Sequence, residues 1–293
     1  MIITNQHNLP EQMVQMAQQE WRVPENTWRV TSLLKGLKEA MLERRHHDEI
    51  TVDVADMVWL LFGTAVHHIL ERQETPDELK EERLRVQFGK YFLTGQFDLY
   101  NDKTKTITDY KTASVWKVIY KDYEDWKRQL LIYAYMLRQL GFNVKKAQVV
   151  AFLKDHSKTK AMRDSSYPQL PVETITFTFT EKDFADIEPW LNLRFDGIAI
   201  AENEPDDEIP HCTEKERWND GGKWAVMKKG RKSALRLLFT EVEARAWMEA
   251  EGKGEYIEHR PGEDTKCLHY CRVKDFCSYW REASKLQIEE IPF

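Results

Sequence analysis

The residues best suited to chemistry lie in two short segments, Gly95-Gln-Phe-Asp98 and Asp109-Tyr-Lys111. Side chains two apart on a strand point to the same face, so Asp109 and Lys111 project together, and a hairpin would bring Asp98 beside them. Two carboxylates and a lysine on one face are costly without a partner, and such oxygen ligands suit Mg²⁺ or Mn²⁺. The lysine can orient or deprotonate a water beside the metal, which is chemistry for hydrolysing a phosphodiester. Taken alone, an Asp-x-Lys pair is more simply a solvated strand face.

Two helical segments carry side chains that can join this group. His67 and Glu71 are four residues apart and share one helix face, and an imidazole serves as a metal ligand or a general base. Gln129 and Tyr133 repeat this spacing on a later helix, from which both can reach one phosphate or the lysine. In isolation, His67 is more simply a core histidine, and the second pair is more simply part of an ordinary mixed helix face.

The elements that position these residues follow from apolar periodicity, caps and turn residues. We expect helices over residues 11–21, 31–46, 53–74, 123–140, 181–202 and 241–251. We expect strands over residues 84–88, 95–100, 106–112, 144–153 and 173–180, with 101–105 as a hairpin loop. A second hairpin is expected over residues 224–239, turning at Lys229-Gly230. This order of elements predicts an α+β fold.

Composition, net charge and the length of apolar runs exclude several classes of protein. The chain has 293 residues, of which 42% are hydrophobic and 31% charged, so one large or two small domains can bury a core. The net charge of −6 argues against a protein that coats nucleic acid through a bulk positive field. The longest purely apolar run, residues 57–62, is too short to span a bilayer, and residues 1–6 lack the pattern of a signal peptide. We therefore expect a cytoplasmic protein with no membrane partner.

The order of the chemical motifs resembles that of the PD-(D/E)XK nuclease superfamily. Over about residues 55–155, four motifs follow one another: Gly63-Thr-Ala-Val-His67-His-Ile-Leu-Glu71, Gly95-Gln-Phe-Asp98, Asp109-Tyr-Lys111-Thr and Gln129-Leu-Leu-Ile-Tyr133. More narrowly, the pattern resembles the RecB-like branch, which includes the RecB and AddB nuclease domains, CRISPR-associated RecB-like nucleases and phage exonucleases. The resemblance implies a restriction-endonuclease-like core, with a mixed central sheet flanked by helices.

The same resemblance implies roles for individual residues. In the family, a histidine and two acidic residues hold one or two Mg²⁺ or Mn²⁺ ions, a lysine serves the attacking water, and a glutamine–tyrosine helix positions the substrate. Carried over, the metal ligands are His67, Asp98, Asp109 and the backbone carbonyl of Tyr110. The predicted catalytic residues are His67, Glu71, Asp98, Asp109, Lys111, Gln129 and Tyr133.

The cysteines form a second candidate metal site. Cys267, Cys271 and Cys277 lie close together in the sequence, and Cys212 is the only other cysteine. Clustered thiols in a reducing compartment favour metal binding over disulfides, and four thiolates fit either zinc or a 4Fe–4S cluster. The alternative is buried cysteines that bind nothing. RecB-like nucleases with iron–sulfur clusters carry a similar C-terminal trio, which favours the cluster. Their fourth cysteine precedes the nuclease motifs, whereas Cys212 follows them.

Residues 203–293 are expected to form a C-terminal region distinct from the nuclease domain of residues 1–202, after an acidic, proline-containing loop at 203–210. Between residues 223 and 236 this region has basic residues and no acidic one. The candidate DNA contacts there are Lys228, Lys229, Arg231 and Lys232, which would guide DNA toward the catalytic residues. The alternative is a solvated hairpin tip.

The final residues, Ile291-Pro-Phe293, follow an acidic pair. They resemble the tail tip of bacterial single-stranded DNA-binding proteins, which docks on partner proteins. We hypothesise that this tail recruits a host repair protein. The alternative is a tail that packs on its own domain or frays.

These features together predict a divalent-metal-dependent deoxyribonuclease, an exonuclease of phage recombination or repair that acts in the bacterial host cytoplasm. Two alternatives stay open. One is a CRISPR-like end-trimming nuclease that acts within a complex. The other is a non-catalytic nucleic-acid-binding scaffold that keeps the nuclease fold.

Overall fold

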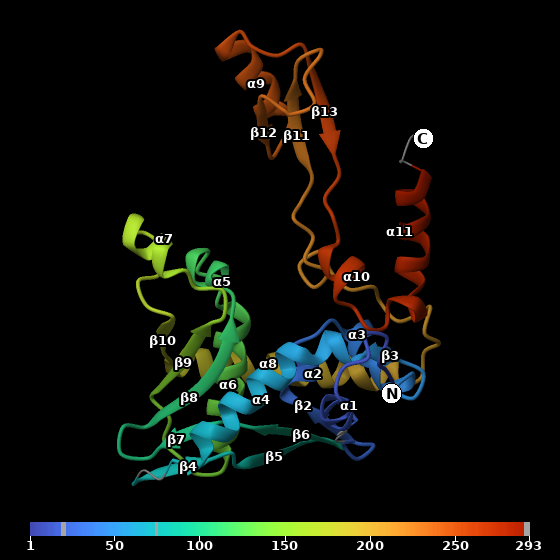
Figure 1. Ribbon diagram of the computed structural model, residues 1–293. Coiled ribbons are helices and arrows are strands. Elements are labelled where there is room, and N and C mark those ends of the chain that lie inside the picture. Colours follow the sequence, from blue (N-terminus) through green and yellow to red (C-terminus); the bar gives the residue numbers. More distant parts are fainter. Residues whose placement is uncertain (19–21, 74–75, 290–293) are drawn as a thin grey trace. The chain divides into compact units, whose positions relative to one another are not determined.

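The computed structural model describes residues 1–18, 22–73 and 76–289, with side chains up to residue 285. The chain divides into two compact units, Met1–Glu204 and Pro205–Phe293 (Figure 1). Residues Ile291–Phe293, which carry the proposed docking tail, lie outside the described residues. No helix in the described part of the chain is both long and apolar enough to cross a membrane.

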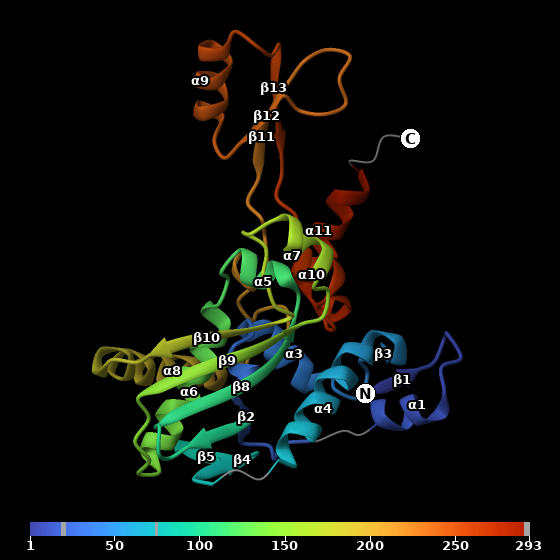
Figure 2. The same cartoon turned by 60° about the vertical axis from the view of Figure 1, so that its left-hand side comes forward.

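A five-stranded sheet with the strand order β10-β9-β8-β7-β4 forms the centre of the first unit (Figure 2). Strand β8 (Thr106–Ala113) pairs in parallel with β9 (Lys146–Leu153) and antiparallel with β7 (Leu99–Asn101). Strands β10 (Val172–Thr178) and β4 (Glu78–Lys80) pair antiparallel at the two edges. This mixed sheet confirms the predicted α+β core.

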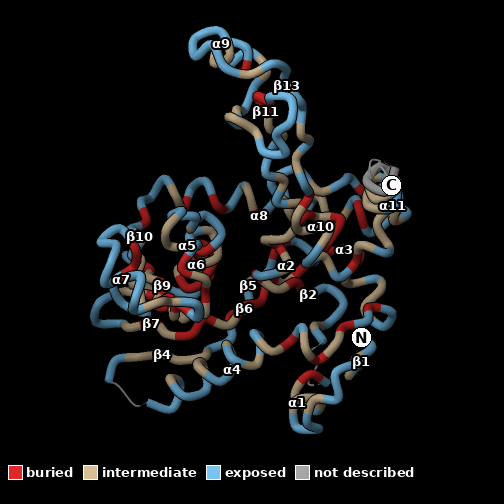
Figure 3. Tube along the Cα trace, turned by 45° about the horizontal axis from the view of Figure 1, so that its top comes forward, coloured by how far each residue is buried: buried red, intermediate tan, exposed pale blue. Residues whose placement is uncertain are grey.

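Helix α6 (Glu124–Gln139) lies in the crossover that joins the parallel strands β8 and β9. Its central residues are buried (Figure 3), and it packs against α8 (Glu181–Ala201). Helix α4 (Val58–Glu71) contacts β8 and differs sharply, because none of its described residues is buried despite its apolar sequence. Alternation along β8 directs successive side chains toward these two different helices.

A second sheet in this unit has three strands in the order β2-β6-β5. Strand β6 (Tyr91–Gln96) pairs in parallel with β2 (Thr27–Arg29) and antiparallel with β5 (Arg83–Phe88). The expected single strand over residues 95–100 is therefore wrong. The chain leaves one sheet after Gln96 and enters the other at Leu99, so Asp98 lies between two strands.

Several predicted helices end or break where local backbone geometry requires it. The expected helix over residues 31–46 is two helices, α2 (Val30–Leu33) and α3 (Leu37–Arg45), because Gly36 has non-helical angles of φ −57° and ψ 145°. The expected helix over residues 53–74 begins with the 3₁₀ turn η1 (Val54–Met57), where the Asp53 side chain accepts a hydrogen bond from Ala55 N–H, and ends with α4 at Glu71. Helix α1 (Glu11–Ala17) falls within the expected 11–21.

Several short elements of the first unit were not predicted by the sequence pattern. Strands β1 (Ile2–Thr4) and β3 (Thr51–Asp53) pair in parallel with each other. Helix α5 (Val115–Ile119) follows β8, and helix α7 (Lys158–Arg163) follows β9. Elements this short contain too few residues for a periodic pattern.

The second unit contains a three-stranded sheet with the order β12-β11-β13. The predicted hairpin is confirmed, since β11 (Lys223–Met227) pairs antiparallel with β12 (Arg236–Leu238). Strand β13 (Tyr256–Arg260), which was not predicted, pairs with the other edge of β11. Helix α9 (Glu241–Glu251) matches its predicted bounds and is capped by Thr240 in a capping box.

The rest of the second unit carries the cysteines on short elements. These are α10 (Thr265–His269), η2 (Lys274–Phe276) and α11 (Ser278–Glu289). Asp264 connects them to the loop that follows Cys212, since its carboxylate pairs with Arg217 Nε at 3.1 Å and accepts a hydrogen bond from Tyr279. Arg217 also donates a hydrogen bond to the backbone carbonyl of Cys212. This network holds two distant parts of the chain together.

Candidate active site

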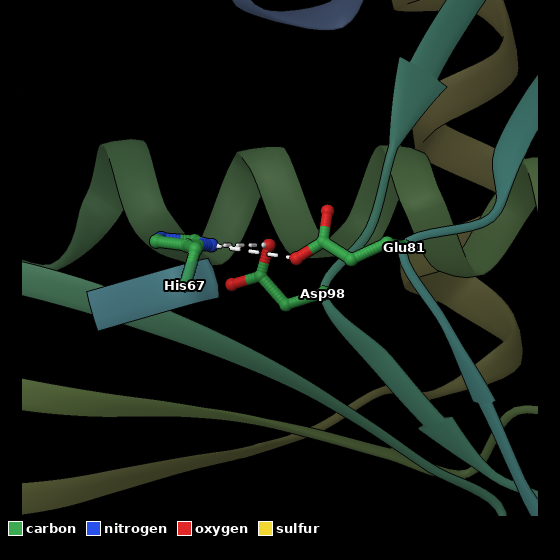
Figure 4. Close-up of side chains that lie close together, drawn as sticks. All are labelled: His67, Glu81 and Asp98. Atoms are coloured by element: carbon green, nitrogen blue, oxygen red, sulfur yellow. Dashed lines mark ion pairs between the residues drawn. The ribbon is translucent and has the colours of Figure 1, made fainter. Parts of the chain in front are cut away.

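His67 on α4 faces two carboxylates from other parts of the chain (Figure 4). Its Nδ1 is 3.3 Å from Oδ1 of Asp98 and 3.6 Å from Oε1 of Glu81, which lies between β4 and β5. The nearby carboxylates, Asp98 first and then Glu81, stabilise the protonated ring, so the pKa of His67 rises to about 10. The protonated ring therefore lies between two carboxylates. The same two carboxylates would also attract a divalent cation.

The backbone of Tyr110 on β8 fixes this arrangement. Its N–H donates a 2.6 Å hydrogen bond to Oδ2 of Asp98, and its carbonyl oxygen lies 3.0 Å from Nε2 of His67. The Glu81 N–H donates a 3.0 Å hydrogen bond to the carbonyl oxygen of Asp98. The predicted carbonyl ligand of Tyr110 therefore lies at the site, where it contacts the histidine.

Asp109 and Lys111 project from the same face of β8, as the alternation predicts. Lys111 Nζ lies 2.8 Å from Oδ2 of Asp109, whose side chain is only 4% exposed. Burial raises the pKa of Asp109, and the charge of Lys111 opposes this shift. Burial lowers the pKa of Lys111, but the charge and hydrogen bond of Asp109, together with the charge of Asp98, outweigh it and raise the pKa overall. The two side chains form a partly buried ion pair beside the histidine site.

Tyr133 reaches this ion pair from α6, and Gln129 lies beside Tyr133 on the same helix. Gln129 Nε2 is 3.4 Å from the Tyr133 hydroxyl, so the two side chains meet on one face of the helix. Burial raises the pKa of Tyr133 to about 12, and the charges of Asp109 and Lys111 act on it as well. The structure therefore brings together the face of α6 and the face of β8 that carry the predicted residues.

Gly95 on β6 makes room for Tyr133, which gives a testable prediction. A Cβ atom at Gly95 would collide with the Tyr133 ring and lie 2.8 Å from Cγ2 of Val30. We expect Gly95→Ala to lower the free energy of unfolding by about 1–3 kcal/mol, because a packed core resists added volume. Gly63→Ala is the matched control, since its Cβ would meet Thr112 Oγ1 at an ordinary 3.7 Å. Equal stability of the two variants in urea titrations would contradict the predicted clash.

An acidic cavity of about 180 Å³ opens beside His67. Its lining includes Glu71, Glu78, Glu81 and Asp98. The ligand atoms of His67, Glu81 and Asp98 all lie within 4.8 Å of one another, and they are the oxygen and imidazole donors that Mg²⁺ and Mn²⁺ accept. These residues fit a divalent cation.

The structure gathers most, but not all, of the predicted ligand set. Among the described residues, the close group contains His67 and Asp98 with Glu81, whereas Asp109 pairs with Lys111. Glu71 lines the cavity, and its Oε2 lies 3.8 Å from Nδ1 of the exposed neighbour His68. The predicted catalytic residues are thus arranged as a histidine–carboxylate group next to a lysine–carboxylate pair.

Glu81 is the member of this group that the sequence pattern did not predict. It lies in the turn between β4 and β5 and has a positive φ of 50°, which is uncommon outside glycine. Backbone strain of this kind is found at sites where the surrounding structure holds a residue for a function. The only signal in the sequence is an acidic pair, Glu81-Glu82, just before a strand.

We predict that Glu81→Gln weakens metal binding while Glu71→Gln has a smaller effect. Loss of the Glu81 charge removes one donor of the close group, and the expected cost is about 10–100-fold in the Mg²⁺ concentration for half-maximal activity. Glu71 lines the same cavity but stands outside that group, so it is the matched control. Metal titrations that give the two variants the same midpoint would contradict a special role for Glu81.

The four cysteines lie in the second unit, and none of them forms a disulfide. Burial, followed by the charge of Cys271 and weaker effects of Cys212 and Cys277, raises the pKa of Cys267 to about 12. The other three thiols are therefore close enough to Cys267 to influence its ionisation. No three of the described sulfur atoms lie within 4.8 Å of one another, so they are less tightly gathered than the donors around His67.

The predicted DNA contacts of the second unit lie in the loop that joins β11 and β12. Lys228, Lys229, Arg231 and Lys232 are all exposed there. The Lys229 N–H donates a 3.2 Å hydrogen bond to Glu255, and Arg231 Nη2 lies 3.5 Å from the hydroxyl of Ser233. The charged heads thus face solvent around the turn.

Comparison with known proteins identifies the class to which this fold and site belong. The sequence model of the PD-(D/E)XK nuclease superfamily matches residues 7–278. The chain therefore belongs to this superfamily, which confirms the predicted resemblance and identifies a nuclease. Members of the superfamily use divalent metal ions, typically Mg²⁺ or Mn²⁺.

Similarity to individual proteins is limited. The crystal structure of SSO0001 is 16% identical, with a TM-score of 0.45 over 67% of this chain and 85% of that one. A phage-related exonuclease from Haemophilus somnus 129PT is 15% identical, with a TM-score of 0.29 over 57% of this chain and 74% of that one. No curated protein matches the sequence at a significant level. The assignment to the superfamily therefore depends on the family match and not on one close relative.

Proposed function

We propose that this protein is a divalent-metal-dependent deoxyribonuclease of the RecB-like branch, acting as an exonuclease in phage recombination or repair in the bacterial cytoplasm. The proposal is supported mainly by two groups of side chains that lie next to each other. The ligand atoms of His67, Glu81 and Asp98 converge within 4.8 Å, and the Asp109–Lys111 ion pair lies beside them. Superfamily membership supports hydrolysis of phosphodiester bonds.

The proposed mechanism assigns each side chain a task. His67, Asp98 and Glu81, with Asp109 at their side, would hold one or two cations. When bound, a Mg²⁺ or Mn²⁺ ion neutralises phosphate charge and makes water a better nucleophile. Lys111 orients the attacking water and stabilises the charge that develops on the phosphate. Gln129 and Tyr133 donate hydrogen bonds that hold the scissile strand.

Cleavage of end-labelled DNA tests this function. Linear and circular substrates, single- and double-stranded, are incubated with Mg²⁺, Mn²⁺ or EDTA. We expect cleavage of linear DNA with either metal, none with EDTA, and intact circles. Cleavage of circular DNA would indicate endonuclease activity and contradict the proposed exonuclease activity. DNA binding without any cleavage would contradict the proposal and favour the partner-dependent or scaffold alternative.

We further propose that Cys212, Cys267, Cys271 and Cys277 bind a 4Fe–4S cluster, with zinc as the alternative. The donor chemistry fits either metal, and the influence of the other three thiols on the pKa of Cys267 supports a common site. Metal analysis and an absorbance spectrum of anaerobically purified protein distinguish the two. A preparation with neither iron nor zinc would contradict the proposal.

The remaining partner proposals rest on sequence features. The exposed basic residues Lys228, Lys229, Arg231 and Lys232 are proposed to bind DNA backbone phosphates. The tail Ile291-Pro-Phe293 is proposed to recruit a host repair protein. Unchanged binding of such a protein after deletion of the three tail residues would exclude that role.

A further inference from the structure

One face of the sheet β2-β6-β5 carries a row of arginines. In the strand register, Thr94 on β6 pairs with Arg29 on β2 and with Arg85 on β5, while Gln96 pairs with Arg83. Paired residues of neighbouring strands point to the same face of a sheet. Arg29, Arg83 and Arg85 therefore share one face.

The β5 side of this face is exposed, whereas the opposite face of the sheet is packed. Leu84 and Phe88 on β5 are buried, and the Phe88 ring lies 5.0 Å from the Phe195 ring of α8. The alternating residues Arg83 and Arg85 are exposed. Arg83 and Arg85 are thus presented outward from a regular strand and not from a loop, and Arg29 is half-buried on the same face.

An aromatic ring holds Arg85 in place. Its guanidinium stacks 3.6 Å from the centre of the Phe92 ring, on the neighbouring strand. Within the described part of the chain, no carboxylate pairs with Arg85. Stacking on a ring leaves the guanidinium N–H groups free to donate at their edge. Such a group matches the forked geometry by which arginine binds phosphate.

The positive charges on this face are also close to one another. Burial and the charge of Arg83 lower the pKa of Arg29. Like charges gathered on one face repel each other, and a bound polyanion would relieve the repulsion. The net charge of the whole chain is −6, so this concentration of positive charge is local.

A chain of hydrogen bonds connects this face to the candidate metal site. Arg83 Nη2 donates a 2.6 Å hydrogen bond to Oε1 of Gln96, and Gln96 Nε2 donates a 2.9 Å hydrogen bond to Oε2 of Glu81. The other oxygen of Glu81 lies 3.6 Å from His67. Glu81, Arg83 and Arg85 alternate along the chain, and β5 runs onward from the turn that holds Glu81 (Figure 1). The arginines thus lead directly away from the metal site.

We propose that Arg29, Arg83 and Arg85 form a phosphate track that binds the backbone of the DNA strand extending from the scissile bond. The inference rests on the proposed nuclease function and adds where the substrate lies. Residues two apart on a strand are separated by about 6.6–6.8 Å, a spacing comparable with that of neighbouring phosphates on a DNA strand. Contacts of this kind position DNA without reading its sequence.

The test measures binding without cleavage. Arg85→Ala is introduced into a Lys111→Ala background, and binding of fluorescently labelled DNA is followed by anisotropy over a range of salt concentrations. We expect roughly tenfold weaker binding and a drop of about one in the slope of log affinity against log salt. Arg85→Lys, which keeps the charge, should recover part of the affinity. Arg83→Ala should act in the same direction.

Arg138→Ala is the matched control. Its guanidinium also stacks on a phenylalanine, 4.0 Å from the Phe184 ring, but it pairs with Glu181 and lies on the α6–α8 side. This variant should keep both the affinity and the salt slope of the parent. If Arg85→Ala behaves like Arg138→Ala, and circular dichroism shows both folded, the phosphate track is wrong.

The outcomes separate this proposal from the proposed function. If the wild-type chain cleaves DNA but Arg85→Ala binds DNA as tightly as the control variant, the phosphate track is wrong and the proposed nuclease function is supported. If the wild-type chain does not cleave DNA but Arg85→Ala weakens DNA binding and lowers the salt slope, the phosphate track is supported and the proposed catalytic function is wrong. A loss of affinity with an unchanged salt slope would also overturn the track, because a lost phosphate contact must reduce ion release.

Discussion

Lys111→Ala is expected to lower the rate of DNA cleavage by about 10²–10⁴-fold while DNA binding survives. Lys111 is placed by β8 beside Asp109, at 2.8 Å, and next to the carboxylate group around His67. Its charge can stabilise the transition state for phosphodiester hydrolysis but contributes little to binding of a long DNA strand. Single-turnover cleavage with Mg²⁺, together with anisotropy binding, measures the two effects separately.

Two controls support the interpretation of this variant. Lys105→Ala removes a lysine one residue before the same strand, where it is paired with Asp102 at 2.7 Å, and should leave the rate unchanged. Lys111→Gln keeps a polar head beside the buried Asp109, so a loss of activity in both Lys111 variants with normal thermal unfolding excludes a folding defect. Cleavage at the wild-type rate by a clean preparation of Lys111→Ala would refute the assignment of this lysine.

Asp98→Asn is expected to lower cleavage on the order of 10³-fold or more, because it removes the carboxylate shared by the whole site. The asparagine side chain is nearly the same size, and its amide oxygen can still accept the 2.6 Å hydrogen bond from Tyr110 N–H, so the backbone arrangement should survive. The lost charge would weaken the hold on a divalent cation. Calorimetric titration with Mn²⁺ should show a lower affinity in parallel with the loss of rate.

Asp102→Asn is the control for this prediction. It lies between β7 and β8, where it pairs with Lys105, and it belongs to neither the histidine group nor the buried ion pair. We expect wild-type cleavage and Mn²⁺ affinity from it. If Asp98→Asn kept the wild-type Mn²⁺ affinity, this carboxylate would not be a metal ligand.

Long, regular elements were predictable from the sequence because their patterns repeat. The amphipathic helix α6 and the strands β8 and β9 lie within a few residues of their predicted bounds. They carry Asp109, Lys111, Gln129 and Tyr133, so the alternation of β8 and the four-residue spacing of α6 were enough to predict which of these side chains meet. This part of the site follows from local periodicity.

The rest of the site depends on contacts that no local pattern contains. Asp98 lies where the chain passes from one sheet to another. The sequence of residues 95–100 resembles one continuous strand, so the break between β6 and β7 could not be predicted from it. Glu81 reaches His67 from a turn with positive φ, and its partners are distant in sequence. The arginine face likewise depends on the register of β2, β6 and β5, which pattern alone does not give.

A divalent cation is expected to bind beside His67 and Asp98. Crystals grown with Mn²⁺ and measured near the manganese absorption edge test it most directly, because anomalous scattering locates the ion without assumptions about activity. We expect an anomalous peak within coordination distance of the Asp98 carboxylate, next to His67 and Glu81 or Asp109. A peak elsewhere in the chain, with none at this group under conditions that support DNA cleavage, would contradict it.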